Sequence, residues 1–321
     1  MLRLILGCRR DSLGAQVVLT FAARAVATSG GNVGFPNLAR KCEELPVVLA
    51  DSGDLEARLA ARGREVRAAQ RLRYRIFFEA GGAAANPIGR LVRRDLCPFD
   101  SVCDHLIVVD KGLAGGRPEV VGAYRLLRQE VAERHFGFYS AREFDLAPLI
   151  MRWPGLRFLE AGRASVAESH RGRRVLDLLW RGLWRYARHH RLDALIGCAS
   201  LPGADPARHS ATIRALASGG DPALRVLPLR EGAAAAPDVS CAPSTDPRAL
   251  LRALPPLVKG YFRLGATFSP IPAVDSAFGS TDLFVVMPLS KIEPRYLKHF
   301  GLDAPQRRPA SRMVSFPADF G

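Results

Sequence analysis

The spacing of apolar residues predicts strands and helices along most of the chain. Residues 55–60 alternate apolar and polar positions with a period of two, which predicts a first strand. Residues 64–78 carry apolar side chains at helical spacing, so we expect a helix there. A stripe of arginines runs beside the apolar face of that helix and comprises Arg64, Arg67, Arg71 and Arg75.

The middle of the chain predicts a hairpin followed by a strand–helix–strand unit. Two apolar runs, 105–109 and 120–127, flank a Gly- and Pro-containing turn, as strands of a β-hairpin do. A strand over 156–166 leads into a long helix that opens at 171–174, and a buried strand follows over 192–199. We therefore expect an antiparallel part of a sheet that continues into a parallel part.

The remaining elements are shorter. Residues 140–143 have the spacing of a capping box, Ser-x-x-Glu, which predicts a helix start. A helix over 257–264, a strand over 281–287 and a short helix over 294–300 complete the pattern. Residues 81–98 are rich in Gly and Ala and are expected to form a loop.

This order of elements predicts one domain of the α+β class, a mixed α/β sandwich. We place the domain at 46–300, with a loose N-terminal extension over 1–45, a surface insertion over 219–250 and a loose tail over 301–321. Neither a G-x-G-x-x-G after a strand nor a Walker A sequence occurs. Dinucleotide redox chemistry and nucleotide hydrolysis are therefore disfavoured.

The charge of the chain indicates an anionic partner. Lys and Arg number 46 against 31 Asp and Glu, a net charge of +15, and only five of the 46 are lysines. Nucleic acid, an acidic carrier protein, a phosphate-bearing ligand and an anionic membrane surface all fit such a surplus. Arginine adds a preference for forked contacts to carboxylate or phosphate. Composition alone does not choose among these partners, and part of the bias has the character of a GC-rich genome.

The cysteines and the hydropathy indicate the cellular compartment in which we expect the protein. Six cysteines scattered through 321 residues are too sparse for a disulfide scaffold, so we expect reduced thiols in a cytoplasmic protein. Cys97, Cys103 and His105 lack the spacing of a zinc site, and no metal is expected. No apolar run reaches the roughly 18 residues that a membrane span needs.

The segment from strand 156–166 into the following helix is the clearest candidate for a ligand site. A strand that runs through an Arg/Gly turn into a helix presents free backbone amides at the positive end of the helix dipole. A pantetheine-type phosphate would lie against Val166, Arg171, Gly172, Arg173 and Arg174. The alternative is a plain β–α turn with basic surface residues.

Several motifs, taken together, resemble a known family. They are FDSVCDHLIV (99–108), VGAYRLL (121–127), GFYSAREFDL (137–146), LEAGR (159–163), GCAS (197–200), KGYFRLGA (259–266) and RYLKHF (295–300). In this order they resemble the ornithine N-acyltransferases of ornithine-lipid synthesis, members of the GNAT-like acyltransferase superfamily, over roughly residues 55 to 300.

The resemblance implies a fold, a reaction and a donor. The fold would be GNAT-like, with a splayed mixed central sheet and flanking helices. The enzyme would move a 3-hydroxyacyl group from the thioester of an acyl carrier protein to the α-amine of ornithine, giving a lyso-ornithine lipid. No cofactor of its own is implied, because the 4′-phosphopantetheine arrives on the carrier.

A more distant similarity, to acyl-homoserine-lactone synthases, implies the site residues. Their signature residues correspond to Arg73 in the first helix, Asp100 and Asp104 after it, Arg125 on a strand, and the pair Glu160 and Arg163. Asp100 is the weaker of these assignments, because the loop acids align least securely.

Aminolysis of a thioester explains why these residue types occur together. The attacking amine must lose a proton, and the carbonyl must be polarised. Glu160 is the candidate base, acting directly or through water, and an ion pair with Arg163 is its equally weighted structural alternative. Asp104 would bind the side-chain ammonium of ornithine and Arg125 its carboxylate, unless the acids merely cap the loop.

Four other residues invite a role but have ordinary alternatives. His105 is a second base candidate, although a buried, hydrogen-bonded histidine is the more common case. Cys198 suggests a covalent acyl-enzyme, but a small thiol at a strand end normally packs. Trp180 and Trp184 line either the core or an acyl tunnel, and the sequence does not separate the two.

The chain departs from the family pattern at three places. Ala161 stands where leucine is usual, and 278–282 reads FGSTD instead of FNTTD. The turn RGRRV (171–175) lacks the close-approach glycine of acetyl-CoA enzymes, which favours a carrier-borne pantetheine.

We therefore expect an acyl-carrier-protein-dependent ornithine acyltransferase. It would work in the cytoplasm, with peripheral contact to the anionic inner membrane and no nucleic-acid partner. The alternatives are a relative that acylates another amine and a non-catalytic basic protein that binds nucleic acid or membrane.

Overall fold

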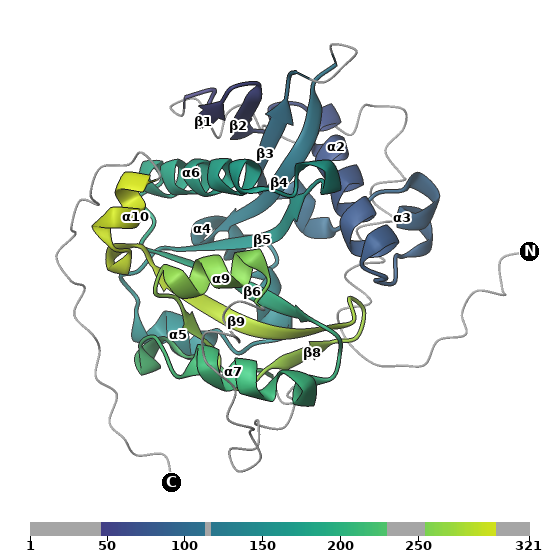
Figure 1. Cartoon of the computed structure of the whole chain (residues 1–321). Coiled ribbons are helices and arrows are strands. Elements are labelled where there is room, and N and C mark those ends of the chain that lie inside the picture. Colours follow the sequence, from purple (N-terminus) through teal and green to yellow (C-terminus); the bar gives the residue numbers. More distant parts are fainter. Residues whose placement is uncertain (1–45, 113–116, 230–253, 300–321) are drawn as a thin grey trace, which may run out of the picture. The chain divides into compact units, whose positions relative to one another are not determined.

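One mixed sheet organises the part of the chain that the computed structural model describes, residues 46–112, 117–229 and 254–299 (Figure 1). Its strands run in the order β1-β2-β3-β4-β5-β6-β9-β7, with β8 paired to β9. Among the described strands, only β5 and β6 pair in parallel. The strands are β1 (Ala50–Ser52), β2 (Leu55–Leu59), β3 (Asp104–Asp110), β4 (Glu119–Arg128), β5 (Phe158–Val166), β6 (Ala194–Pro202), β7 (Thr267–Phe268), β8 (Ala273–Asp275) and β9 (Ser280–Pro288).

The sheet splits between its two parallel strands. β5 and β6 pair only from Phe158↔Ala194 to Glu160↔Ile196 and then separate. Beyond the split β5 stays with β4, and β6 stays with β9 along its whole length. Gly197 lies at the fork, where an added Cβ would come 2.6 Å from the carbonyl oxygen of Ala161. The close approach of the two backbones therefore requires glycine at this position.

Two long helices cover opposite faces of the antiparallel half. α6 (Arg173–His189) packs on β1 to β4, where its Val175 approaches Gly122 and its Gly182 approaches Leu106. α2 (Gly63–Tyr74) lies against β3, β4 and β5 and continues into the π-helical segment η2 (Arg75–Ala80). Alternate residues of β3 and β4 therefore face different helices.

Short helices connect these layers. They are α3 (Pro87–Val92), η3 (Pro98–Ser101), α4 (Gln129–Ala132), η4 (Tyr139–Arg142), α5 (Ala147–Arg152), η5 (Glu168–His170), η6 (Pro206–His209), α7 (Ser210–Ala217), η7 (Pro222–Leu224), α9 (Pro256–Arg263), η8 (Leu289–Lys291) and α10 (Pro294–His299). A hydrophobic core packs against β5, β6 and β9, and in it Phe144 lies against Phe284 with ring centroids 5.5 Å apart. This core fixes the end of η4 next to the fork.

The structure confirms the α+β class, the mixed splayed sheet, both long helices and the expected strands. The pattern missed the short elements β1, β7, β8, α3, α4, α5 and α7, although it predicted α9 and α10, which are no longer than α7. The capping box was wrong. Ser140 lies inside η4 and its hydroxyl donates to Glu160, so its partner is tertiary and not local.

Three predicted segments fall largely outside the described residues: 1–45, 301–321 and most of the insertion 219–250. The described start of that insertion is packed into the core through Leu224 and Val226. Phe144 forms a β-bridge with Pro228.

Candidate active site

A cavity of about 340 Å³ lies where β5 and β6 separate. Arg125 of β4 and Glu160 of β5 line it from one half of the sheet. Cys198 of β6 and Asp282 of β9 line it from the other half. The split therefore brings polar side chains from both halves of the sheet to one hollow.

Glu160 is a buried carboxylate held by η4. Its Oε2 accepts a hydrogen bond from the N–H of Tyr139 (2.7 Å), and its Oε1 accepts one from the N–H of Ser140 (2.7 Å). The hydroxyl of Ser140 also donates to Oε1. These bonds take the place of the ion pair with Arg163 that was the structural alternative for Glu160.

Arg163 lies at an irregularity of β5. Its φ of 55° is left-handed, and the register between β4 and β5 shifts beside it. Its Nε lies 3.3 Å from Asp95 Oδ2, and its Nη2 donates to the hydroxyl of Tyr139 (3.1 Å). The guanidinium also stacks over the ring of Phe278, 4.4 Å from its centroid. Arg163 therefore lines the cavity but contacts Asp95 and not Glu160.

Arg73, Asp100 and Arg125 form one buried network. Arg73 donates from Nε to Asp95 Oδ2 (2.8 Å) and from Nη2 to Asp100 Oδ2 (2.6 Å). Nη1 of Arg125 lies 3.6 Å from Asp100 Oδ1 and makes no hydrogen bond. Burial opposes the charged form of Asp100, but Arg73 and Arg125 outweigh it and lower the pKa of that carboxyl below its usual range. Of the three predicted residues, only Arg125 lines the cavity.

The structure does not bring Asp104 together with Arg125. Asp104 accepts a hydrogen bond from the hydroxyl of Tyr186 on α6 (2.6 Å) and lies 3.9 Å from Nε of Arg128. In the register of β3 and β4, Arg125 is opposite His105, the neighbour of Asp104. Successive side chains of a strand point to opposite faces, so Asp104 faces α6 while Arg125 faces α2 and η3. A joint ornithine pocket from these two residues is therefore ruled out.

A second set of acids lines the cavity instead. Glu143, Asp275 and Asp282 all contribute to its wall. Burial and the nearby carboxyl groups of Asp282 and Asp275 raise the pKa of Glu143 to about 8. Burial likewise raises the pKa of Asp282, although the hydroxyls of Ser280 and Ser200 act against it. Part of the cavity wall is therefore a group of carboxyls that share a desolvated space.

The structure also places the other residues for which the sequence suggested a role. Burial raises the pKa of the Cys198 thiol well above its usual value, which disfavours the thiolate that covalent catalysis would need. His105 Nε2 contacts the carbonyl oxygen of Asp100 (3.1 Å), and burial lowers the pKa of its ring. Trp180 packs edge-on against Tyr261, which lines the cavity, with centroids 5.3 Å apart. Among the described residues, Glu143, Cys198 and Asp282 are the group with metal-ligand spacing, and Cys97 and Cys103 are not in it.

The predicted phosphate turn joins the end of β5 to α6. Val166 is the last residue of β5 and Gly172 is the N-cap of α6, with no side-chain cap. An added Cβ at Gly172 would meet nothing within 4 Å, so the space before the helix is open. Arg171 pairs with Glu168 (3.5 Å), and Arg174 donates to the carbonyl of Ser52 (3.0 Å). The backbone of Arg173 begins α6.

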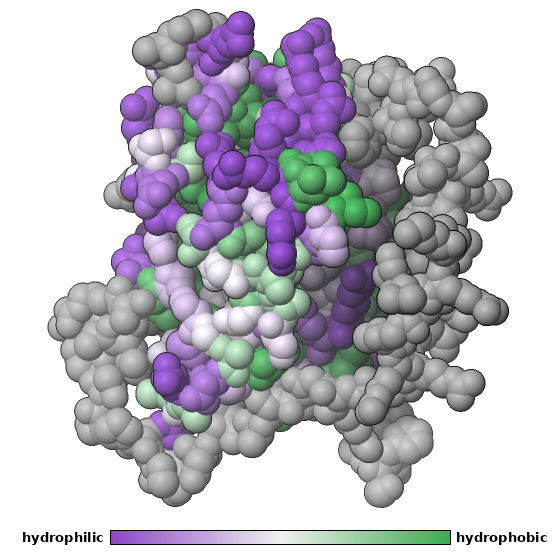
Figure 2. Space-filling model, turned by 90° about the vertical axis from the view of Figure 1, so that its right-hand side faces the viewer, coloured by the Kyte–Doolittle hydropathy of each residue, from purple (hydrophilic) through white to green (hydrophobic). Residues whose placement is uncertain are grey.

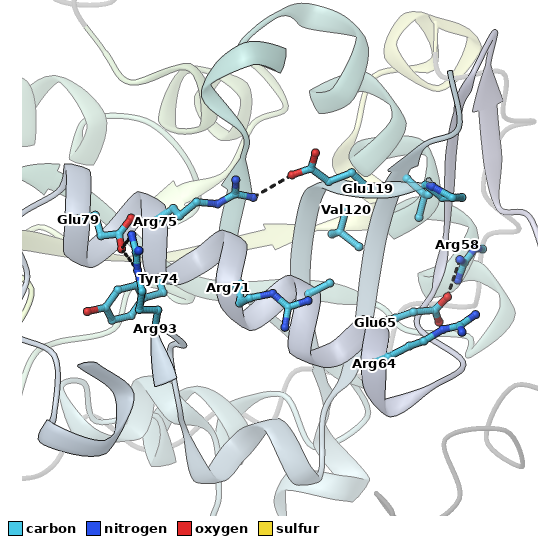
Figure 3. Close-up of a pocket in the computed structure, with 13 residues that line it drawn as sticks. Arg58, Arg64, Glu65, Arg71, Tyr74, Arg75, Glu79, Arg93, Glu119 and Val120 are labelled. Carbon is cyan, nitrogen blue, oxygen red and sulfur yellow. Dashed lines mark hydrogen bonds and ion pairs between the residues drawn. The ribbon is translucent and has the colours of Figure 1, made fainter. Parts of the chain in front are cut away.

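A larger hollow of about 810 Å³ lies outside the split, along the arginine stripe of α2 (Figure 3). Its charged side chains pair with one another: Arg75 with Glu119 (3.2 Å) and Arg93 with Glu79 (2.6 Å). These pairs are largely exposed. Figure 2 shows hydrophilic side chains gathered over the upper part of the adjoining face, beside a small apolar patch. Here the charges are solvated, whereas those of the split are buried.

Sequence comparisons identify the family. The model of the acetyltransferase (GNAT) domain matches residues 72–181. L-ornithine N(alpha)-acyltransferase from Agrobacterium fabrum is 45% identical over 258 residues, covering 78% of this chain and 87% of its own length. The enzyme of that name from Rhizobium meliloti is 43% identical over 263 residues, covering 80% and 88%. The chain belongs to the L-ornithine N(alpha)-acyltransferase family.

A solved structure resembles this acyltransferase only distantly. An N-acyl amino acid synthase from uncultured soil microbes matches with a TM-score of 0.41 and 12% identity, covering 73% of this chain and 90% of that one. Within the described part of the acyltransferase, no helix combines the length and the apolarity needed to span a bilayer.

Sequence reasoning missed the acids of this acyltransferase for an identifiable reason. Glu143 has the spacing of a local cap, and Asp282 ends the segment 278–282 that departs from the family pattern, so the sequence does not single out either as a binding residue. Both lie within motifs that carried the resemblance or departed from it. The available signal is an acid directly before the apolar run 283–287 of the predicted strand, as Asp282 is in β9.

Proposed function

We propose that this acyltransferase moves a (3-hydroxy)fatty acyl group from the thioester of an acyl carrier protein to the α-amine of L-ornithine, giving a lyso-ornithine lipid. The observation that carries the proposal is the cavity at the split sheet, where Glu160 and Arg125 are buried beside unpaired strand edges. The names of the relatives, which specify L-ornithine and its α-amine, support the choice of acceptor.

The split supplies what thioester aminolysis requires. The α-nitrogen forms a C–N bond to the thioester carbonyl, the C–S bond breaks, and the carrier's thiol leaves with a proton. Beyond Glu160 the edge of β5 that pairs with β6 has lost its strand partner. Backbone N–H groups on such an edge are available to stabilise the developing oxyanion.

Glu160 is our candidate for the proton acceptor. It lines the cavity, and the donors from η4 hold both its oxygens in place. A carboxylate at this position takes the proton of the attacking amine, directly or through one water. The η4 segment thereby orients the base, and Arg163 supports η4 through the hydroxyl of Tyr139.

The carrier-borne arm fits the route from the β5–α6 turn into the split. Its phosphate would bind the uncapped start of α6, at Val166, Arg171, Gly172, Arg173 and Arg174. The free N–H groups of the first helical turn suit an anion. The pantetheine would then run along the open edge of β5 toward Glu160.

The basic surface suits two anionic partners. The hollow along α2 carries Arg64, Arg71 and Arg75, a surface for an acidic carrier protein. Helix α3 exposes Leu91 (84%) and Ile88 (65%). Exposed apolar residues among arginines suit peripheral contact of a cytoplasmic enzyme with an anionic membrane. Sedimentation with anionic vesicles tests that contact, and Leu91→Asp should abolish it if the proposal is right.

A reconstituted reaction tests the proposal. The full chain is incubated with 3-hydroxyacyl carrier protein and ornithine, and mass spectrometry follows the loss of thioester and the formation of amide. δ-N-acetylornithine, which offers only the α-amine, should still be acylated, although more slowly, if the α-amine is the acceptor.

Each outcome bears on a separate part of the proposal. Turnover with another amine but not with ornithine overturns the acceptor. Turnover with acyl-CoA but not with the acyl carrier protein overturns the donor. Inactivity with every thioester overturns the reaction for this chain.

A further inference from the structure

Three acidic side chains gather in the half of the cavity that no part of the proposed chemistry uses. Asp282 is on β9, and Asp275 ends β8, whose neighbour Val274 pairs with Thr281. Glu143 follows η4. The carboxylate oxygens of Glu143 and Asp282 and the thiol of Cys198 lie within 4.8 Å of one another. The acids thus come from segments about 130 residues apart in sequence.

In the described part of the chain, this group has no cationic partner. None of the ion pairs there involves Glu143, Asp275 or Asp282. Apart from the contact between Glu143 and Asp282, their hydrogen bonds come from neutral groups: the hydroxyl of Ser280 donates to Asp282 Oδ1 (2.8 Å), and the N–H groups of Ala277 and Phe278 donate to Asp275 Oδ1 (2.9 and 3.0 Å). The thiol of Cys198 lies 3.9 Å from Glu143 Oε2. Arg163, whose charge acts against the rise in the pKa of Glu143, is held by Asp95 and Tyr139.

Carboxyls packed together in a desolvated space must share a proton or bind a cation. The first of these states, a shared proton, agrees with the raised pKa of Glu143, about 8. A cationic ligand group would provide the second by displacing the shared proton to solvent. The arrangement is therefore ready to exchange a proton for a positive charge.

A second, independent feature of the cavity also points to a ligand. Arg125 is only 4% exposed, lines the same cavity from β4, and has Nη1 without a hydrogen bond. This Nη1 lies 3.6 Å from Asp100 Oδ1, too far for a hydrogen bond, so Asp100 compensates the guanidinium only in part and its charge can still attract a ligand carboxylate in the cavity. Because Arg125 and the acids are on opposite halves of the split sheet, the cavity offers an anion site and a cation site across one space.

We propose that Glu143 and Asp282, with Asp275, form the subsite for the side-chain ammonium of the acceptor, while Arg125 binds its carboxylate. This subsite makes the enzyme select amino acids with a cationic side chain. It replaces Asp104, which faces α6, in the role that the sequence suggested. The inference rests on the proposed function, because it names the part of that site which recognises the acceptor.

Equilibrium binding tests the subsite without requiring turnover. Calorimetry on the full chain compares ornithine with norvaline, which has the same chain but lacks the terminal amine. The wild type should bind ornithine about 10- to 100-fold more tightly, the size expected for one charge-assisted contact. Glu143→Gln and Asp282→Asn should each remove most of that difference and leave norvaline binding unchanged.

Control variants keep the result interpretable. Glu133→Gln removes an exposed glutamate outside the cavity and should bind both ligands as the wild type does. Arg125→Gln should weaken ornithine and norvaline equally, since both carry the carboxylate. Thermal unfolding of each variant checks that the fold is retained, and Asp282→Asn serves if Glu143→Gln does not fold.

Three results would overturn the subsite. The first is that norvaline binds to the wild type as tightly as ornithine does. The second is that the two acid variants weaken the binding of both ligands alike. The third is that a chelator abolishes ornithine binding and Mn²⁺ or Zn²⁺ restores it, because the group would then be a metal site. Ornithine bound as described but never acylated would leave the subsite standing and overturn only the proposed reaction.

Discussion

The two hollows of this acyltransferase differ in how their arginines are solvated. Along α2 the space is larger, about 810 Å³, and Arg75 and Arg93 lie in water beside exposed glutamates. At the split the space is about 340 Å³, and Arg125 is buried with an unbonded nitrogen. Removing one partner of a solvated ion pair costs little stability, whereas removing one partner of a buried pair, such as that of Arg125 with Asp100, costs much. The size of a hollow therefore says less about its chemistry than the state of its polar atoms.

The largest effect should come from the base at the split. Glu160→Gln keeps the shape of the side chain but cannot take a proton, so kcat should fall about 10²- to 10⁴-fold. The reaction with 3-hydroxyacyl carrier protein and ornithine measures this, with circular dichroism as a check on the fold. Wild-type kcat in a folded variant would show that Glu160 only holds η4.

The next effect compares two arginines of one helix turn. Arg73 is 1% exposed and pairs with Asp95 and Asp100, whereas Arg75 is about half exposed and pairs with Glu119. Arg73→Met should lower the free energy of unfolding by about 3–5 kcal/mol, since it removes the shortest ion pairs of two buried carboxylates, Asp95 and Asp100. Arg75→Met should change it by less than about 1 kcal/mol. Urea unfolding measures both, and equal losses would remove the contrast between the hollows.

A third effect concerns the acids of the split. The folded-state pKa of Glu143, about 8, is above its unfolded value. The folded state therefore keeps a proton that the unfolded state releases, and stability falls as pH rises between about 4.5 and 8. Glu143→Gln removes this loss and should be more stable than the wild type at pH 8 by about 1–2 kcal/mol, with little difference at pH 4. Thermal melts at the two pH values check this, and a constant difference would contradict it.

The smallest effect is expected at the solvated hollow. Replacing Arg64 and Arg71 by glutamine should raise the KM for the acyl carrier protein about 3- to 10-fold at low salt, and less at high salt. The KM for ornithine should not change, because neither residue lines the split. Steady-state kinetics at two ionic strengths test this, and a change in the KM for ornithine alone would contradict the role proposed for the hollow.

The sequence predicted the fold better than it predicted the site. Apolar residues that repeat every two or every 3.6 positions predict the sheet and the long helices, because β3 to β6 and α6 each bury one or both faces. The split itself came from the resemblance, since the loss of pairing after Glu160 leaves no pattern in β5.

The sequence indicated several of the residues in and around the cavity, but not which of them lie together. Arg73, Asp100 and Arg125 do lie together, whereas Asp104 points to the other face of β3. That difference depends on which of two adjacent residues faces α2, and the register between β3 and β4 shifts at Val108. Glu143 meets Asp282 through tertiary packing across about 140 residues, which local spacing cannot show.

The short junction between β5 and β6 also bears on how the chain avoids association with its own copies. Unpaired strand edges are templates onto which another polypeptide can add, and proteins usually have to block them. Here the two open edges diverge from one fork, and residues of both line the same narrow cavity. Both edges therefore face one cavity, and neither is presented as an open edge to a neighbouring molecule.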